Sequence, residues 1–452
     1  METPGTASGL SRRHFLGGTL GGLASLYLAR CGFGSSSSAE GEVDVLYDMT
    51  YQGPPGTVSD YWRSMRDELR GEEAVLGQLQ ETPFEALFQS VEAQSRAKSG
   101  ATLVTWYSDH HTFREYKKGN LTAVETLVPE SELNHWLLRS TEFDGEVWGS
   151  SETLEVGVLV INRRHFEKAG VDVDVEFESY DAFIEACERL KAAGITPIQA
   201  GTSDGFNAEK WLYFHHFQVC ENPADLLGGL VGEVSLDAPV FADPRRKIPV
   251  LRDNYMNDNP ENDTEEIATQ RFMQGSAGMM LMYTHPIFTP DVGAEFEVIG
   301  FPKSPARFNR PAVGTANVLN VMEYGENQDA AGEVIQFLHE PERLATWWEL
   351  TRSLPGDDRL DASLLPPTAE RTWELVTRNK GDAFSIWWPG NFFPASAFAY
   401  QYGVTQDQFA GAGADEARAQ TEEVFERFRG ESPRGVEIVN DNIRALDAVF
   451  EA

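Results

Sequence analysis

The stretch from Trp148 to Ala200 constrains the fold more than any other part of the chain. Within it, Val156–Ile161 is almost entirely apolar and rich in β-branched residues, which predicts a buried strand. An amphipathic helix is expected to begin after Ser179, its N-cap, and to stop at Gly194. A second apolar strand closes the stretch. Strand, helix and strand in this order form a βαβ-type unit, which is typical of an α/β domain.

Three short motifs follow one another in this stretch: Gly157-Val-Leu-Val-Ile-Asn162, Phe166-Glu-Lys-Ala-Gly170 and Leu190-Lys-Ala-Ala-Gly-Ile-Thr-Pro-Ile198. Their order and spacing resemble the signature of family 1 extracellular solute-binding proteins, the maltose-binding-protein-like receptors of ABC importers. Later segments, such as Ala330–His339 and Ser353-Leu-Pro-Gly356, also have counterparts in that family. The resemblance covers about residues 42–450, which is nearly the whole chain after its leader.

The resemblance implies an α/β, two-lobed, periplasmic-binding-protein-like fold of type II. In that fold several crossovers join hinged lobes on either side of a cleft. A chain of 452 residues is long enough for two lobes that each have a core. We expect lobe 1 to consist of residues 42–150 and about 286–340, and lobe 2 of residues 151–285 and about 341–452, with the first crossing near Trp148–Glu155.

Residues 1–38 have the character of a targeting segment. Ser11-Arg-Arg-His-Phe-Leu16 matches the twin-arginine export motif, and the apolar stretch Leu16–Leu28 is short for a membrane span. Leu28-Ala-Arg-Cys31-Gly resembles a lipobox, and this resemblance makes Cys31 the expected lipid anchor. The segment departs from the lipobox pattern at Arg30, where a small residue is usual. A Ser-rich tether follows. The alternative is an uncleaved leader on a cytoplasmic protein.

The chain is strongly acidic, with 71 acidic and 37 basic residues and a net charge of −34. Only 9 of the basic residues are Lys. This pattern favours an acidic surface adapted to high salt, where self-repulsion is screened; ordinary acidity that keeps the protein soluble is the alternative. The lack of a basic face argues against nucleic-acid binding.

Candidate ligand-binding side chains follow from strand ends and from the resemblance. Open α/β sheets bind ligands at the carboxyl ends of their strands, which selects Tyr51, Asp109 and His110. Family members often place an aromatic residue early in the helix where Lys210 and Trp211 occur; a Trp packed in the core is the alternative for Trp211. The remaining candidates are Glu152, Glu155, Tyr283, His285, Asn317, Trp387 and Trp388.

The sequence departs from the family at two positions that often stack on sugar. The Gly-x-Trp end of one family motif is replaced by Tyr283-Thr-His285, and Ala399 stands where a Trp is frequent, so Trp387 and Trp388 are expected to compensate. The pairs His110-His111 and His215-His216 do not predict a metal site, because adjacent side chains on one strand point to opposite faces.

The resemblance implies the receptor of an ABC importer, which captures a sugar or oligosaccharide by hinge closure. Its partners are then the small-molecule solute and the permease and ATPase subunits, and we expect a monomer without cofactors. One alternative is the same fold with another solute, such as a glycerol-phosphate compound, a polyamine or a metal chelate. The other is an exported enzyme that acts on polysaccharide. We do not expect an enzyme, because the sequence has no nucleophile elbow, His-Glu-x-x-His or Gly-rich phosphate loop.

Overall fold

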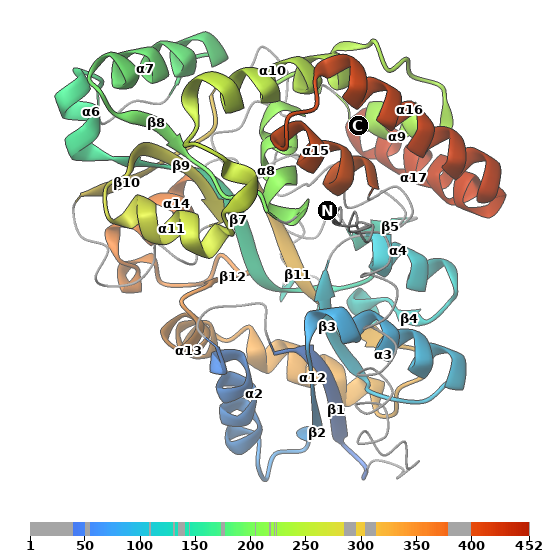
Figure 1. Ribbon diagram of the computed structural model, residues 1–452. Helices are drawn as coiled ribbons and strands as arrows, with labels where there is room; N and C mark the ends of the chain where they lie inside the picture. The colour runs from blue at the N-terminus through green and yellow to red at the C-terminus, as the bar shows by residue number, and fades with distance from the viewer. Residues whose placement is uncertain are drawn as a thin grey trace, which may run out of the picture.

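A computed structural model of the chain shows a two-lobed α/β fold, with one lobe above and one below in Figure 1. Among the described residues, no helix is both long enough and apolar enough to cross a membrane. The structure describes residues 39–49, 55–107, 110–129, 132–133, 141–143, 145–172, 177–203, 205–216, 218–220, 222, 224–283, 295–302, 313–377 and 399–451.

One mixed sheet extends through both lobes. Its main strands are β1 (Glu42–Asp48), β2 (Val75–Thr82), β3 (Leu103–Tyr107), β7 (Ser150–Asn162), β8 (Thr196–Gln199), β9 (Ala277–Tyr283) and β11 (Val313–Met322). They lie in the order β2-β1-β3-β11-β7-β9-β8. The first three are parallel, and β11 is antiparallel to both of its neighbours. Three short strands pair with β7 or β11 of this sheet: β4 (Leu121–Thr122), β10 (Phe296–Ile299) and β12 (Leu354–Pro355). A separate two-stranded sheet consists of β5 (Glu142–Phe143) and β6 (Glu146–Val147).

The lower lobe packs helices around the parallel strands, and its core includes Trp62, Leu103, Val318 and Ile335. The helices of this half are α2 (Thr57–Glu68), α3 (Phe84–Ala97), α4 (His110–Lys117), α12 (Gln328–Leu338) and α13 (Pro341–Thr351), whereas α14 (Pro367–Thr377) lies beside β10. After α4 the chain forms a two-residue strand at Leu121–Thr122 and a 3-10 turn at Val124–Thr126.

The upper lobe is mostly helical around β8, β9 and the end of β7, with a core that includes Phe183, Phe214 and Phe241. The C-terminal helices return to this lobe and cover its right side in Figure 1. Its helices are α6 (Arg163–Ala169), α7 (Tyr180–Ala192), α8 (Gly205–His216), α9 (Ala224–Val231), α10 (Pro239–Tyr255), α11 (Glu265–Met273), α15 (Thr405–Phe409), α16 (Ala414–Glu431) and α17 (Pro433–Glu451).

The central stretch has the predicted elements but a different pairing. Ser179 caps α7, because its Oγ accepts the N–H of Ala182 at 3.2 Å, and Gly194 follows the helix with φ 73°. However, β7 and β8 are not neighbours, because β9 lies between them. Strand β7 runs antiparallel to β9, which is parallel to β8, so the stretch is not a parallel βαβ unit. The reason is that β7 enters from the other lobe and reaches β9 with its second half.

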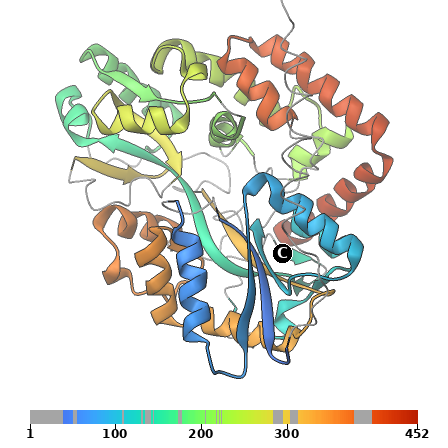
Figure 2. The same ribbon diagram turned by 60° about the horizontal axis from the view of Figure 1, so that its bottom comes forward.

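A third hydrophobic cluster joins the two halves. It contains Leu154 and Val156 of β7 together with Trp348 of α13 and Trp373 of α14. Helix α13 also packs on α2, with the rings of Tyr61 and Trp347 edge to face at 4.8 Å, and the two helices lie side by side in Figures 1 and 2. Strand β7 and helix α13 therefore contact both halves of the molecule.

Candidate functional site

Strands β7 and β11 are irregular where two of the predicted site residues lie. Asn317 pairs with Thr153, whereas Val318 pairs with Ser151, so Glu152 is the extra residue of a β-bulge. The carbonyl of Glu152 accepts the N–H of Gly356 at 3.0 Å. A bulge re-aims side chains and is frequent beside functional sites. The structure thus brings Glu152 and Asn317 together at the strand that joins the lobes.

The carboxyl group of Glu152 is shielded from water although the residue as a whole is only partly buried. Its Oε1 is buried and has no hydrogen-bond partner. Burial raises its pKa to about 8, and the negative charge of Asp48 at the end of β1 adds to the effect. At pH 7 this carboxyl is therefore mostly protonated and can donate a hydrogen bond as well as accept one.

Asn317 offers a second polar atom without a partner. The residue is 5 % exposed, and its Oδ1 accepts no hydrogen bond. Its backbone pairs with Tyr107, at the carboxyl end of β3, and with Thr153 on β7. Buried carbonyl oxygens are nearly always hydrogen-bonded, so this oxygen is available to a hydroxyl or amino group from outside the chain.

Lys210 and Trp211 lie on α8, in the upper lobe. Lys210 is buried and forms an ion pair with Glu265 at the start of α11. Trp211 is 2 % exposed and packs on Phe214 at 5.6 Å between ring centroids. These contacts fit the alternative of a core Trp, and the role of either residue in ligand binding stays a prediction.

The other predicted residues are placed only in part. By backbone position, His110 begins α4, Glu155 lies opposite Thr315 on β11, and Tyr283 ends β9 opposite Gly157. Tyr51, Asp109, His285, Trp387, Trp388 and Cys31 lie outside the described residues, as does the whole 1–38 leader.

Both histidine pairs lie in helices, and not in strands as the sequence suggests. His111 stacks on Phe88 at 3.9 Å, and His215 lies in the core against Phe214. Burial holds the pKa of His215 well below its usual value, with help from the charges of Lys247 and His216. Within the described part of the chain, no group of three or more His, Cys, Asp or Glu side chains is arranged to hold a metal ion.

An aromatic pair between the lobes was not predicted. The rings of Tyr116 and Trp148 lie 4.8 Å apart, and both residues are partly exposed. Both also pack against the hydrophobic clusters of the upper and the lower lobe. The carbonyl of Trp148 accepts Nδ2 of Asn320 at 2.6 Å, which fixes its position. In the sequence, Trp148 marked only the start of the crossing, and nothing there indicates that Tyr116 meets it.

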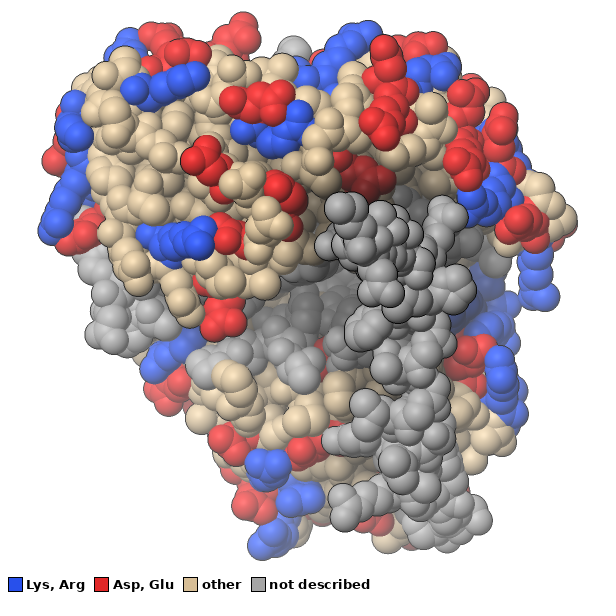
Figure 3. Space-filling view, in the orientation of Figure 1, with Lys and Arg blue, Asp and Glu red and all other residues tan. Residues whose placement is uncertain are grey.

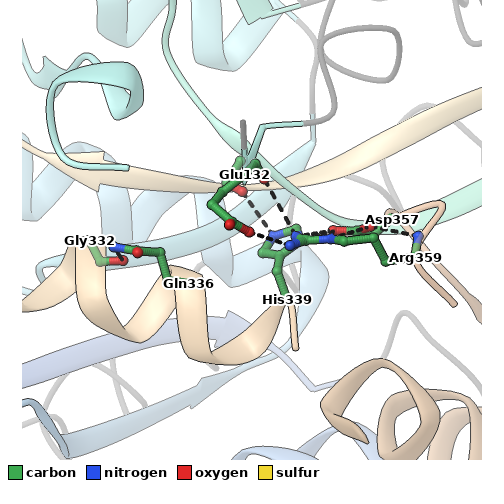
Figure 4. A network of polar contacts seen from close by, with 7 residues as sticks. Glu132, Gly332, Gln336, His339, Asp357 and Arg359 are labelled. Carbon is green, nitrogen blue, oxygen red and sulfur yellow. Dashed lines mark hydrogen bonds and ion pairs between the residues drawn. The ribbon is translucent and has the colours of Figure 1, made fainter. Parts of the chain in front are cut away.

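A second feature missed from the sequence is a buried polar network at the lower end of β7 (Figure 4). His339, at the end of α12, is hydrogen-bonded through Nε2 to Ser150 Oγ at 2.9 Å and through Nδ1 to Asp357 Oδ2 at 2.6 Å. Arg359 donates to the same Asp357 oxygen at 2.6 Å and forms an ion pair with Glu132. Burial alone would raise the pKa of Asp357, but the hydrogen bonds from His339 and Arg359 outweigh it and hold this pKa well below its usual range.

The order Ser150, His339, Asp357 is that of the triad in serine hydrolases. A nucleophile must reach its substrate beside donors that stabilise an oxyanion. Ser150 is only 2 % exposed, and Asp357 is fully buried and shares its carboxylate with Arg359. We interpret the network as structural, because it ties β7, the end of α12 and the segments of Glu132 and Arg359 to one another.

The lobes also touch on the side away from α13. Lys117 at the end of α4 forms an ion pair with Asp441 of α17 at 3.0 Å. One turn earlier, Phe113 is buried in the hydrophobic cluster of the upper lobe. Figure 3 shows charged side chains of both signs over the upper and the lower part of the molecule.

Comparisons with known proteins agree with this architecture. A family model described as bacterial extracellular solute-binding protein matches residues 78–343, more than half of the chain. No curated protein sequence matches the chain.

Among solved structures, the solute receptor AcbH, reported to prefer β-D-galactopyranose exclusively, is similar with a TM-score of 0.73 at 14% identity, covering 87% of this chain and 98% of the receptor. A chitin oligosaccharide binding protein gives a TM-score of 0.68 at 16% identity, covering 85% and 99%. The acarbose-binding GacH receptor of Streptomyces glaucescens gives 0.63 at 16% identity, covering 86% and 98%. At these identities the likeness shows the fold.

Proposed function

The chain belongs to the family of bacterial extracellular solute-binding proteins, and from this premise we propose that it is the substrate-binding receptor of an ABC importer. We propose further that it captures a sugar or oligosaccharide between its lobes. A ligand that contacts both lobes favours the closed form, because it binds that form more tightly.

The observation that supports this proposal most directly is the bulge on β7. There Glu152, protonated at neutral pH, and Asn317, with a free carbonyl oxygen, lie on strands shared by both lobes. A neutral ligand rich in hydroxyl groups matches such uncharged donors and acceptors. The partly exposed rings of Tyr116 and Trp148 lie between the lobes, where an aromatic face can contact a sugar ring. The structures named above include receptors for sugars and oligosaccharides.

The proposed binding residues fall into two groups. The first lies where β7 joins the lobes and is described by the structure; the second consists of candidates from the sequence that remain predictions. Glu152, Asn317 and the aromatic pair Tyr116–Trp148 form the described part. The rest of the proposed set, carried over from the sequence, is Tyr51, Asp109, His110, Glu155, Lys210, Trp211, Tyr283, His285, Trp387 and Trp388.

We also propose the division into lobes expected from the sequence, residues 42–150 with about 286–340 and residues 151–285 with about 341–452. One change is suggested by packing: α13 contacts α2 as well as the third cluster, so this helix is better treated as a connector.

Membership of an extracellular family implies export of this protein. The proposed route is the twin-arginine pathway, through Arg12 and Arg13, with lipid attachment at Cys31 to hold the receptor at the outer face of the membrane. Permease and ATPase subunits are the proposed protein partners of a monomeric receptor. The net charge of −34 supports an acidic surface adapted to high salt.

The experiment that tests this function is a thermal shift of the leaderless protein in molar salt. The panel contains mono- and oligosaccharides, sugar alcohols, glycerol phosphates, polyamines and metal chelates. A ligand that binds only the native state raises the melting temperature. At a ligand concentration of a hundred times Kd, the free energy of unfolding increases by about 2.7 kcal/mol. A rise with one sugar class supports the proposal.

Other outcomes separate the alternatives. If the melting temperature rises only with phosphates, polyamines or chelates, the protein is still a receptor, but its ligand is not a sugar. Turnover of a chromogenic glycoside, without stoichiometric binding, would support the exported enzyme and contradict the receptor.

A further inference from the structure

A small cavity lies in the lower lobe beside the bulge of β7. Helices α2 and α13 form one wall, and β7 with the end of α12 forms the other. Its free space is about 290 Å³, which includes the part that opens to solvent, and roughly one water molecule fits in the enclosed part. The polar and aromatic residues that line it are Tyr61, Trp62, Ser151, Glu152, His339 and Trp347.

Four buried polar atoms of these lining residues have no hydrogen-bond partner. They are Nε1 of Trp62, Oγ of Ser151, Oε1 of Glu152 and Nε1 of Trp347. His339 has no nitrogen left for the cavity, because Ser150 and Asp357 occupy both. An unpaired buried polar atom costs about 1–3 kcal/mol, so four of them on residues that line one cavity favour a guest that pairs with them.

The chemistry of the four atoms selects the guest. Indole nitrogens only donate hydrogen bonds, so Trp62 and Trp347 require an acceptor and disfavour a cation. The negative charge of the nearby Asp48 disfavours an anion. Ser151 and a carboxyl group both donate and accept. A water molecule can pair with all four atoms, because its oxygen accepts two hydrogen bonds and it donates two, whereas an alcohol hydroxyl, with one proton, can pair with three of them.

We propose that this cavity is a binding site for one hydroxyl-bearing guest, an ordered water molecule or the hydroxyl of a small alcohol in its place. The guest links the bulge of β7 to α2 and α13. The cavity shares Glu152 with the proposed sugar site, but its other lining residues, including those on α2, α13 and the end of α12, are not among the proposed sugar-binding residues.

The backbone around the cavity is built for close approach. A Cβ on Gly356 would lie 1.8 Å from Ser151 Oγ, so only Gly fits there. The N–H of Gly356 donates to the carbonyl of Glu152, which holds the bulge in place. Ser151 and Glu152 therefore have a fixed position from which to reach the guest.

The first test is the sign of a stability change in the leaderless protein. If a guest is bound, Ser151→Ala removes a hydrogen bond, and the equilibrium constant for unfolding rises about three- to tenfold. If the cavity is empty, the same variant removes an unsatisfied hydroxyl and the protein becomes more stable. Urea unfolding at pH 7 distinguishes the two signs, and a gain in stability overturns the proposal.

Ser353→Ala is the matched control. Ser353 is buried like Ser151 and its Oγ also has no partner, but it does not line the cavity. We expect its stability to be unchanged or higher. Equal destabilisation by both variants would contradict a guest specific to the cavity.

The second test is crystallographic and identifies the guest. Crystals grown without alcohols are compared with crystals soaked in ethylene glycol. Electron density within hydrogen-bond distance of Trp62 Nε1 and Ser151 Oγ supports the site. If both crystals contain water there, the guest is water. If glycol replaces the water after soaking, the site also accepts alcohol hydroxyls. An empty cavity in both crystals overturns the proposal, whatever the result of the sugar panel.

Discussion

Folding raises the pKa of the Glu152 carboxyl group. A carboxyl group in an unfolded chain has a pKa of about 4.3, whereas burial beside Asp48 raises that of Glu152 to about 8. Between these values the folded state holds one more proton than the unfolded state. The stability that this group contributes is therefore complete below about pH 4 and falls as the pH rises towards about 8.

We predict that Glu152→Gln flattens this dependence. The variant cannot ionise and has the same shape, so its free energy of unfolding should decrease less than that of the wild type between about pH 5 and about pH 8. Chemical denaturation at several pH values and constant salt measures the difference. Subtracting the two curves removes the contribution of the many other carboxylates. Parallel curves would show that Glu152 is ionised in the folded protein at neutral pH.

Two tryptophans are predicted to behave differently. Trp148 is partly exposed between the lobes, so Trp148→Ala should weaken binding of the sugar found in the panel about tenfold and leave the fold intact.

Trp211 is buried in the upper core, so Trp211→Ala should cost about 3–5 kcal/mol of stability. Calorimetric titration and thermal unfolding separate the effects. Unchanged affinity in a folded Trp148→Ala variant would remove this residue from the site.

At the scale of elements, the polar network of Figure 4 joins segments that are distant in the chain. Strand β7 enters the junction at Ser150, helix α12 ends at His339, and the loop after β12 supplies Asp357. Because its pKa is held low, the stability that Asp357 contributes is present above about pH 4 and is lost as the pH falls below this range.

We predict that Asp357→Asn destabilises the protein by about 2–4 kcal/mol, because it removes the charge that His339 and Arg359 share in the interior. Urea unfolding at pH 7 measures this loss. Asp361→Asn is the control: Asp361 is exposed and caps a short 3-10 turn, a role that Asn also fills. A loss of the same size in both variants would contradict a special role for the network.

For the whole molecule, the contact between α4 and α17 connects the lobes away from the shared strands. Lys117 and Asp441 are each about one-third exposed, so their ion pair is worth less than about 1 kcal/mol and is weakened by salt. In a hinged receptor, even that amount shifts the ratio of open to closed molecules.

We predict that Lys117→Gln raises the open fraction of the ligand-free protein about two- to fivefold at low salt. Small-angle X-ray scattering detects the change as a larger radius of gyration, and the difference from the wild type should vanish in molar salt. Arg444→Gln is the matched control, because Arg444 pairs with the same Asp441 from within α17. If both variants scatter alike, the pair between the lobes does not bias closure.

The sequence by itself determined the local elements and the family. The Ser179 cap, the Gly194 stop and the apolar run Val156–Ile161 depend on neighbours in the chain, and the structure has each of them. The family suggested by three motifs in the central stretch is confirmed by the family model. These features are readable because propensity, capping and spacing act over a few residues.

Only the tertiary structure decided what these elements do together. The bulge at Glu152 depends on pairing with Asn317, which lies far along the chain, and the burial that changes its acidity depends on β1 and α2. The same holds for the meeting of Tyr116 with Trp148. No periodicity encodes such contacts, because burial, register and electrostatics arise from surfaces that come together only when the chain has folded.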